Sequence, residues 1–329
     1  MKTVYYPPAG PSAAVPYTAI ISQFTEQFTE QFTEQCAATI GFFDGVHRGH
    51  VFLIEQLKRE ADARGLRSMV ITFECHPRQV VQPQWQPQLL TTLEEKAHFI
   101  EETGIDVLVV LRFDRSMAAL SARDFMQQVL KEQLGVSLLL TGYDNRFGHN
   151  REEGFADYRR YGQELGIEVV CGTPFGERGE QFSSSFIRRL IADGRVDEAA
   201  RCLGRPYDLT GTVVHGEQIG RTLGFPTANL RVDQEGRLLP ATGVYAVSVQ
   251  RESQGLIYKG MMNIGHRPTF DGHRTTLEVH LFDFSGTLYG ERLTVAFKSR
   301  LREERQFPTP EALKAQMQQD AEQAKKMTK

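Results

Sequence analysis

The feature that most constrains the fold lies between residues 37 and 204, where short apolar runs alternate with helix-like stretches. The runs include SMVITF, DVLVVL and SLLLTG, and helical stretches are expected between them at residues 51–63, 93–103 and 122–134. Such alternation builds βαβ units, which form a parallel sheet with helices on both faces. We therefore predict a Rossmann-like α/β domain over residues 36–204.

The pattern changes after residue 205. Strand-like runs such as GVYAVSVQ and TTLEVHLFDF follow one another with glycine-rich turns between them, which predicts an antiparallel barrel or sandwich. A terminal helix is expected from Thr309 to about Lys326, because Pro310 suits a first helical turn. A length of 329 residues is comfortable for two domains. We place the second domain at residues 205–329.

Residues 1–35 are predicted to be a poorly ordered lead-in. They contain four prolines near the start and end in three copies of Phe-Thr-Glu-Gln. The segment has no apolar run long enough for a signal peptide, and a period of four residues matches neither a heptad nor a solenoid. We expect no catalytic group there.

Composition excludes several classes of partner. The formal net charge of -3 does not favour nucleic acid or an anionic membrane, and no run approaches the ~20 apolar residues of a membrane span. No CxxC pair is present, so neither a zinc site nor a redox dithiol is indicated, and a reducing cytoplasm fits best. The cysteines are Cys36, Cys75, Cys171 and Cys202.

The first motif is GFFDGVHRGH, residues 41–50, which follows an apolar run and opens a helix-like stretch. Glycines let backbone amides approach an anion, and a helix N-terminus adds partial positive charge. His47 and His50 lie three residues apart, so both imidazoles face one side of the first turn and can donate to phosphate oxygens. A partly exposed helix start or a metal fragment is the alternative, but HxxH without a third ligand is weak evidence for metal.

At these residues the chain resembles nucleotidyltransferases with an HxGH signature, specifically the adenylyltransferase module of bacterial FAD synthetases. Residues 72–77 resemble the TFxPHP loop of that module, with Cys75 replacing the first proline. Residues 141–148 resemble its GYDFRFG segment, with Asn145 in place of Phe. Residues 183–188 resemble its SSTxIR loop, with a serine in place of threonine.

The resemblance implies that the phosphate of FMN attacks the α-phosphorus of ATP in line and that pyrophosphate leaves. Such a reaction needs positioning and charge stabilisation rather than a protein nucleophile. His47 and His50 are then expected to stabilise the transition state, and Asp144 and Asn145 to contact the flavin. The implied nucleotide and phosphate contacts are Gly41, Phe42, Asp44, Gly45, Gly49 and His76, with Ser184, Ser185 and Arg188 on the β- and γ-phosphates.

The second motif is GRTLGFPTAN, residues 220–229, which follows the run GTVVHG. Its glycines leave the loop free to fold over a ligand, and Pro226 fixes the backbone. Thr227 and Asn229 present hard oxygen ligands that suit Mg²⁺ and phosphate. For a generic cluster of this composition, an ordinary β-turn would be the favoured interpretation.

The whole string resembles the riboflavin kinase signature, and the resemblance continues over most of residues 205–320. It implies a six-stranded Greek-key barrel with Thr227 and Asn229 at the metal and phosphates. Arg302 and Glu304 are the implied flavin contacts. The other implied nucleotide contacts are Gly216, Gly220, Arg221, Gly224 and Pro226.

Glu278 is the candidate general base. Alternation along its strand places Glu278 and His280 on one face and Val279 on the other. Taken alone, a glutamate on a strand would be a solvated surface residue. The resemblance to kinases implies that it accepts the proton of the ribityl 5′-hydroxyl as that oxygen attacks the γ-phosphorus of ATP.

Together the two resemblances predict a bifunctional enzyme of FAD biosynthesis that acts on riboflavin, FMN and ATP, with Mg²⁺ as cofactor and ATP as co-substrate. We expect a monomer or weak homo-oligomer, with neither nucleic acid nor membrane as partner. Two alternatives remain open at this point. One is a riboflavin kinase whose N-terminal module is only structural, and the other is a non-catalytic flavin or nucleotide sensor.

Overall fold

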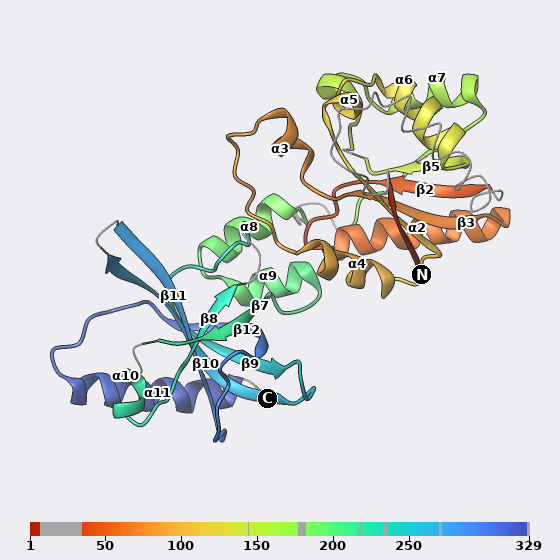
Figure 1. Cartoon of the computed structure of the whole chain (residues 1–329). Helices are drawn as coiled ribbons and strands as arrows, with labels where there is room; N and C mark the ends of the chain where they lie inside the picture. The colour runs from red at the N-terminus through yellow and green to blue at the C-terminus, as the bar shows by residue number, and fades with distance from the viewer. Residues whose placement is uncertain are drawn as a thin grey trace. The chain divides into compact units, whose positions relative to one another are not determined.

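The computed structural model describes residues 1–6, 35–143, 145–176, 182–216, 219–232, 236–269 and 272–327 (Figure 1). Within it the chain divides into two compact units, Met1–Phe182 and Ser183–Lys329. Most of the Phe-Thr-Glu-Gln repeat lies outside the described residues, so the expectation for it stays a prediction.

The first unit contains a parallel sheet, which confirms the predicted α/β class. Its six strands are hydrogen-bonded in the order β1, β4, β3, β2, β5, β6. The strands are β1 (Lys2–Tyr6), β2 (Cys36–Ile40), β3 (Arg67–Phe73), β4 (Val107–Leu111), β5 (Val136–Thr141) and β6 (Glu168–Cys171).

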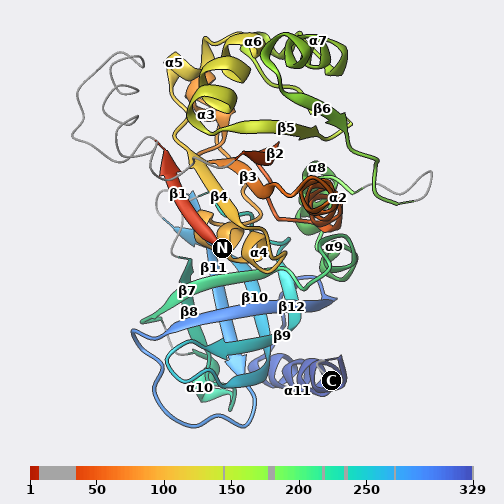
Figure 2. The ribbon, with the colours of Figure 1, turned by 90° about the vertical axis from the view of Figure 1, so that its right-hand side faces the viewer.

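Helices cover both faces of this sheet (Figures 1 and 2). On one face, Ile54 and Leu57 of α2 and Ile100 of α4 pack into a buried core with the strands. On the other, Val129 of η1 and Tyr158 of α7 belong to a second buried core. The helices of the unit are α2 (Arg48–Arg64), α3 (Pro77–Val81), α4 (Leu93–Glu101), α5 (Arg115–Ala118), α6 (Ala122–Asp124), the π-helix η1 (Phe125–Gln133), the 3-10 helix η2 (His149–Arg151) and α7 (Phe155–Leu165).

Strand β1 corrects the predicted lead-in at its start. Residues 2–6 run parallel to β4 at the edge of the sheet, with Lys2 opposite Val107 and Tyr6 opposite Leu111. The run KTVYY has the β-branched and aromatic residues that favour a strand, and its hydrogen bonds come from a segment distant in sequence. The expectation of poor order was therefore wrong for these residues.

The sheet also fixes where ligands can bind. Strand β2 lies between β3 and β5, and the strand order reverses around it. In open α/β sheets, ligands bind outside the carboxyl ends of the strands at such a switch point. The loops that follow β2 and β5 hold residues 41–47 and 142–148, so the first motif and the segment that resembles GYDFRFG meet the sheet at this place.

The second unit contains a closed antiparallel barrel, as predicted. Its strands follow the order β10, β11, β8, β7, β12, β9, and β9 pairs back onto β10. The helix α11 (Pro310–Met327) lies along one side of the barrel, packed on β9, β10 and β12 (Figures 1 and 2). The other elements are α8 (Ser184–Ala192), α9 (Val196–Leu203), β7 (Asp208–Val214), α10 (Ile219–Thr222), β8 (Ala228–Val232), β9 (Gly243–Arg251), β10 (Ile257–Thr269), β11 (Gly272–Leu281) and β12 (Arg292–Arg302).

The division between the units differs from the boundary expected at residue 205. Helices α8 and α9 pack against one another, and α9 packs on β12 of the barrel. Gly194, in the turn between the two helices, has a φ of 77° and lies so close to Arg300 that an added Cβ would be 2.8 Å from its Cδ. These contacts place residues 183–204 with the barrel, because the helix pair buries its apolar side there.

Two candidate active sites

The first site is the loop that links β2 to α2. Phe43 and Val46 have φ values of 52° and 37°, and both side chains are buried. Left-handed backbone is costly for residues other than glycine, above all for a β-branched one, and such strain concentrates at ligand-binding loops. Gly45, between them, has a φ of 81°, and its N–H donates to Thr91 Oγ1 at 3.1 Å.

His47 and His50 come together at the start of α2. Their rings stack with centroids 3.6 Å apart and an interplanar angle of 19°. His47 is the N-cap residue, and its Nδ1 accepts the backbone N–H of His50 at 3.3 Å. Because Nδ1 accepts, the ring proton of neutral His47 is on Nε2. Gly49 permits this packing, since a Cβ there would be 3.1 Å from the His47 ring.

Asp44 was expected to contact phosphate, but its carboxylate binds backbone N–H groups instead. The residue is 3% exposed, and its carboxylate accepts the backbone N–H groups of Leu90 and Thr91 at 3.0 and 3.2 Å. A buried carboxylate that faces backbone donors anchors a loop, whereas its charge would repel a phosphate. In this structure Asp44 therefore joins the β2–α2 loop to the segment just before α4.

His76 lies beside the same loop. Its ring is 4.6 Å from that of Phe42 and 4.7 Å from that of Trp85, and its Nδ1 accepts the backbone N–H of Arg78 at 3.1 Å as the N-cap of α3. Gly41 allows this loop to close, because a Cβ there would be 3.0 Å from the Phe43 ring. The structure thus brings the TFxPHP-like loop to the first motif.

The remaining expected contacts of the first site fall into three groups. Asn145 uses its amide to donate to the carbonyl of Ile40 at 2.6 Å, which joins the loop after β5 to the end of β2. Asp144 lies outside the described residues. Ser184, Ser185 and Arg188 lie on α8, which belongs to the second unit, so their grip on phosphates stays a prediction.

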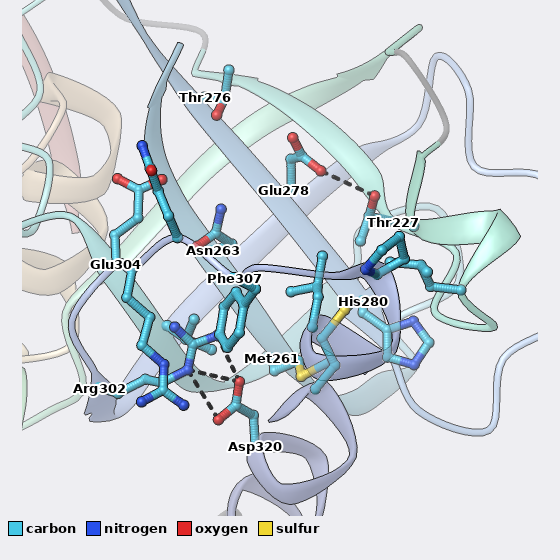
Figure 3. Close-up of a pocket in the computed structure, with 18 of the residues that line it drawn as sticks. Thr227, Met261, Asn263, Thr276, Glu278, His280, Arg302, Glu304, Phe307 and Asp320 are labelled. Carbon is cyan, nitrogen blue, oxygen red and sulfur yellow. Dashed lines mark hydrogen bonds and ion pairs between the residues drawn. The ribbon is translucent and has the colours of Figure 1, made fainter. Parts of the chain in front are cut away.

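The second site is a pocket of about 730 Å³ on the barrel (Figure 3). It is lined by the outer face of β9, β10 and β11, by the loop around α10, and by α11 with the segment that leads into it. Side chains on the opposite face of these strands, such as Val247, Met262 and Val279, are fully buried inside the barrel. The ligand-sized space therefore lies between barrel and helix, and not within the barrel.

Strand register gathers the candidate catalytic groups in one row. Glu278 on β11 is directly opposite Asn263 on β10 and Asn229 on β8, and opposed residues of antiparallel strands point to the same face. Thr227, just before β8, donates from Oγ1 to Glu278 Oε2 at 3.3 Å (Figure 3). Three oxygen-bearing side chains from the expected set, Thr227, Asn229 and Glu278, thus lie close together.

Three glycines allow the close packing and the backbone turn around this row of side chains. A Cβ on Gly216 would overlap the amide of Asn229, and one on Gly220 would overlap the carbonyl oxygen of Phe225. Gly224 has a φ of 85°, which only glycine adopts without strain. The side chain of Arg221 lies outside the described residues.

His280 makes a hydrogen bond to the backbone of the second motif. Its Nδ1 is 2.7 Å from the carbonyl oxygen of Pro226, and since a carbonyl only accepts, Nδ1 carries the proton. Burial lowers the pKa of His280, and the positive charge of Lys325 acts in the same direction. The neutral imidazole therefore fixes the turn that places Thr227 beside Glu278.

Arg302 and Glu304 occupy the other end of the pocket. The guanidinium of Arg302 donates from Nε to both carboxylate oxygens of Asp320 on α11, at 3.2 and 3.0 Å, and lies 5.4 Å from the ring centre of Phe307. Asp320 is 2% exposed, so Arg302 anchors the helix to the barrel as well as lining the pocket. Glu304 lies over Gly265, where a Cβ would be 2.5 Å from its Oε1.

The donor set of the second site fits Mg²⁺. A hydroxyl, an amide and a carboxylate oxygen are the ligands this ion accepts, and it commonly takes only one or two protein ligands besides substrate phosphates. Among the described residues, no group of three or more His, Cys, Asp or Glu side chains could hold a metal. A site that relies on Thr227 and Asn229 is consistent with both observations.

Two pocket groups were not assigned from the sequence. His280 shares a face with Glu278, and that alternation was a usable signal, but its bond to Pro226 depends on tertiary structure. Asn263 opposes Glu278 across β10 and β11, which only the register shows. In the first unit, Lys96 was also missed, because nothing in the sequence indicates that it is buried.

Comparison with known proteins identifies the family of each part of the chain. The sequence model of the FAD synthetase family matches residues 29–186, and that of the riboflavin kinase family matches residues 203–328. The chain is 40% identical to a bifunctional riboflavin kinase/FMN adenylyltransferase of Haemophilus influenzae, over 88% of this chain and 93% of that protein. It is also 40% identical to the protein of the same name from Escherichia coli K12, over 87% and 90%.

A crystal structure has the same overall fold. It is described as a macrolide-efflux protein from Streptococcus pneumoniae, is 31% identical, and matches with a TM-score of 0.81 over 89% of this chain and 95% of that one. Within the part of this chain that the structure describes, no helix has the length and apolar character required to cross a membrane.

Proposed function

Because the chain belongs to the family of bifunctional riboflavin kinase/FMN adenylyltransferases, we propose that it phosphorylates riboflavin to FMN and then adenylylates FMN to FAD with release of pyrophosphate. The single observation that carries the proposal is that Glu278 accepts a hydrogen bond from Thr227 inside a pocket of about 730 Å³, with Asn229 opposite Glu278 in the strand register. A pocket of this volume is typical of small-molecule sites.

In the kinase reaction, Glu278 is the general base. Its carboxylate would accept the proton of the ribityl 5′-hydroxyl while that oxygen attacks the γ-phosphorus of ATP and ADP leaves. Thr227 supports this role because its hydroxyl donates to one carboxylate oxygen and so orients the group. Asn263, opposed to Glu278 on β10, supplies a further polar group to the pocket, and Asn229 opposes Glu278 on the other side, on β8.

Thr227 and Asn229 are the residues that would hold Mg²⁺. When bound there, the ion neutralises charge on the β- and γ-phosphates of ATP. His280 and Gly216 act on this pair indirectly, since the first fixes the Pro226 turn and the second leaves space for the Asn229 amide. The cytoplasmic location expected from the sequence remains a prediction.

In the adenylyl transfer, His47 and His50 stabilise charge at the phosphates of ATP. Their stacked rings lie at a helix N-terminus, where the helix dipole also favours an anion. The phosphate of FMN is already ionised at neutral pH, so no base is required for its attack. The ring of His76, on the loop after β3, packs against the ring of Phe42 on the β2–α2 loop and so joins the two loops of the site.

Product analysis tests the proposal and its alternatives. The purified chain is incubated with riboflavin, ATP and Mg²⁺, and FMN and FAD are separated by chromatography. Formation of both products supports the bifunctional enzyme, with FMN appearing first. FMN alone would favour a kinase with a structural N-terminal unit, and neither product would favour a sensor.

A further inference from the structure

Lys96 is a buried cation next to the loops of the first site, and the mechanism above does not use it. It lies on α4, is 3% exposed, and donates from Nζ to the backbone carbonyls of Phe42 at 3.2 Å and Phe73 at 3.0 Å. Phe42 lies near the start of the loop that carries His47, and Phe73 ends the strand whose following loop carries His76. One ammonium group therefore joins both loops of the site.

Further contacts around Lys96 also join the loops of the first site. Its Nζ is 4.3 Å from the centre of the Phe42 ring, a cation–π distance, and that ring meets the ring of His76. Asp44 of the same loop binds the backbone N–H groups of Leu90 and Thr91, immediately before α4. The backbone of the segment before α4 and the lysine on α4 thus both anchor the first loop.

We propose that Lys96 is a positioning residue for adenylyl transfer, which holds the loops bearing His47 and His76 in one fixed arrangement through their backbone carbonyls. The inference rests on the proposed FMN adenylyltransferase activity. Transition-state stabilisation depends on donors held in place before the reaction, so a shift of the first loop lowers turnover more than it lowers substrate affinity.

The cost of burying this charge supports a functional role. Desolvation lowers the pKa of Lys96 to about 8, although the negative charge of Asp44 opposes the shift. A buried ammonium is unfavourable compared with an apolar side chain of similar length. Packing of α4 alone would therefore not select a lysine at this position.

The test uses the full chain with Lys96→Met, which keeps an unbranched side chain one atom shorter and removes its donors. The turnover number for FAD formation from supplied FMN and ATP is expected to fall about 10–100-fold, with KM for ATP changed less than about threefold. Riboflavin phosphorylation by the same preparation should be unchanged. Assays are run well below the unfolding temperature of the variant.

Lys58→Met is the matched control. Lys58 lies in the same unit and also donates from Nζ to a backbone carbonyl, that of Thr103 at 2.9 Å, in a turn with no expected site residue. This variant should keep the wild-type turnover number for FAD formation. An equal loss in both variants would show a general effect of removing lysine–carbonyl bonds and would overturn the proposal.

Other outcomes are equally decisive. A turnover number for Lys96→Met within twofold of wild type, or a raised KM with unchanged turnover, would overturn the positioning role. If Lys96→Met does not fold, Lys96→Gln, which retains an N–H donor, is measured in the same way. Failure of both to fold would show that the lysine maintains the fold itself and would overturn the positioning role. Absence of FAD formation by the wild type would instead refute the proposed function.

Discussion

At the residue scale, the two sites depend on backbone positions as much as on reactive side chains. Gly216 has no catalytic atom, yet any side chain there would displace the Asn229 amide from the row that contains Glu278. Phe43 and Val46 keep left-handed backbone so that His47 can cap α2 and stack on His50. Strained or close-packed backbone thus positions the candidate catalytic side chains of both sites.

The lowered pKa of Lys96 predicts a pH dependence of FAD formation that FMN formation does not share. Burial lowers it from 10.5 to about 8, while Asp44 and Cys75 favour the protonated form. Charge-assisted hydrogen bonds are roughly twice as strong as neutral ones, so loss of the proton weakens the hold on both loops. FAD formation from supplied FMN should therefore decline as pH rises through about 8, and Lys96→Met should lack this decline.

Stability should change in the opposite direction over the same range. Between about pH 8 and 10.5 the unfolded chain binds a proton at Lys96 that the folded chain does not, so the contribution of this group to stability rises with pH. Rate profiles and urea unfolding from pH 7 to 10 measure the two trends. Parallel decline of activity and stability, both absent from Lys96→Met, would contradict the assignment.

At the scale of elements, the α8–α9 pair is the least expected feature. It carries the segment that resembles the adenylyltransferase loop, but its turn packs on the barrel. Gly194 lies against Arg300, and an added Cβ would be 3.0 Å from Tyr245 Oη. Burial raises the pKa of Tyr245 to about 12, as expected for a hydroxyl enclosed by this packing.

Gly194→Ala should therefore destabilise the second unit through both strain and overlap. The φ of 77° costs an alanine about 1–2 kcal/mol, and the contacts with Arg300 and Tyr245 add about 1–3 kcal/mol. Gly255→Ala is the matched control, because Gly255 has a φ of 66° with nothing within 4 Å of an added Cβ. Denaturant unfolding measures both variants, and equal losses would show that the helix pair is not tightly packed on the barrel.

The sequence predicted elements well wherever local pattern determines them. Apolar alternation identified the parallel sheet, and Pro310 marked the start of α11. Strand β1 was missed because its partner β4 is distant in sequence, so only the pairing of Lys2 with Val107 reveals it. Asp44 was assigned to phosphate because burial and backbone donors cannot be seen in a motif.

At the scale of the whole molecule, each unit contains its own candidate chemistry. The first unit holds His47 and His50 at the carboxyl end of a parallel sheet, and the second holds Glu278 in a pocket on a closed barrel. The central claim is therefore that one chain performs two reactions with different catalytic groups. FMN is the product of one reaction and a substrate of the other.

The most direct test measures both reactions in two single variants of the full chain. Glu278→Gln keeps the shape of the side chain and removes its basicity, so FMN formation from riboflavin should fall ~10²–10⁴-fold while FAD formation from supplied FMN continues. His50→Ala should lower FAD formation ~10²–10³-fold and leave FMN formation unchanged. Loss of FAD formation from supplied FMN in folded Glu278→Gln, or of FMN formation in folded His50→Ala, would contradict two separate sites.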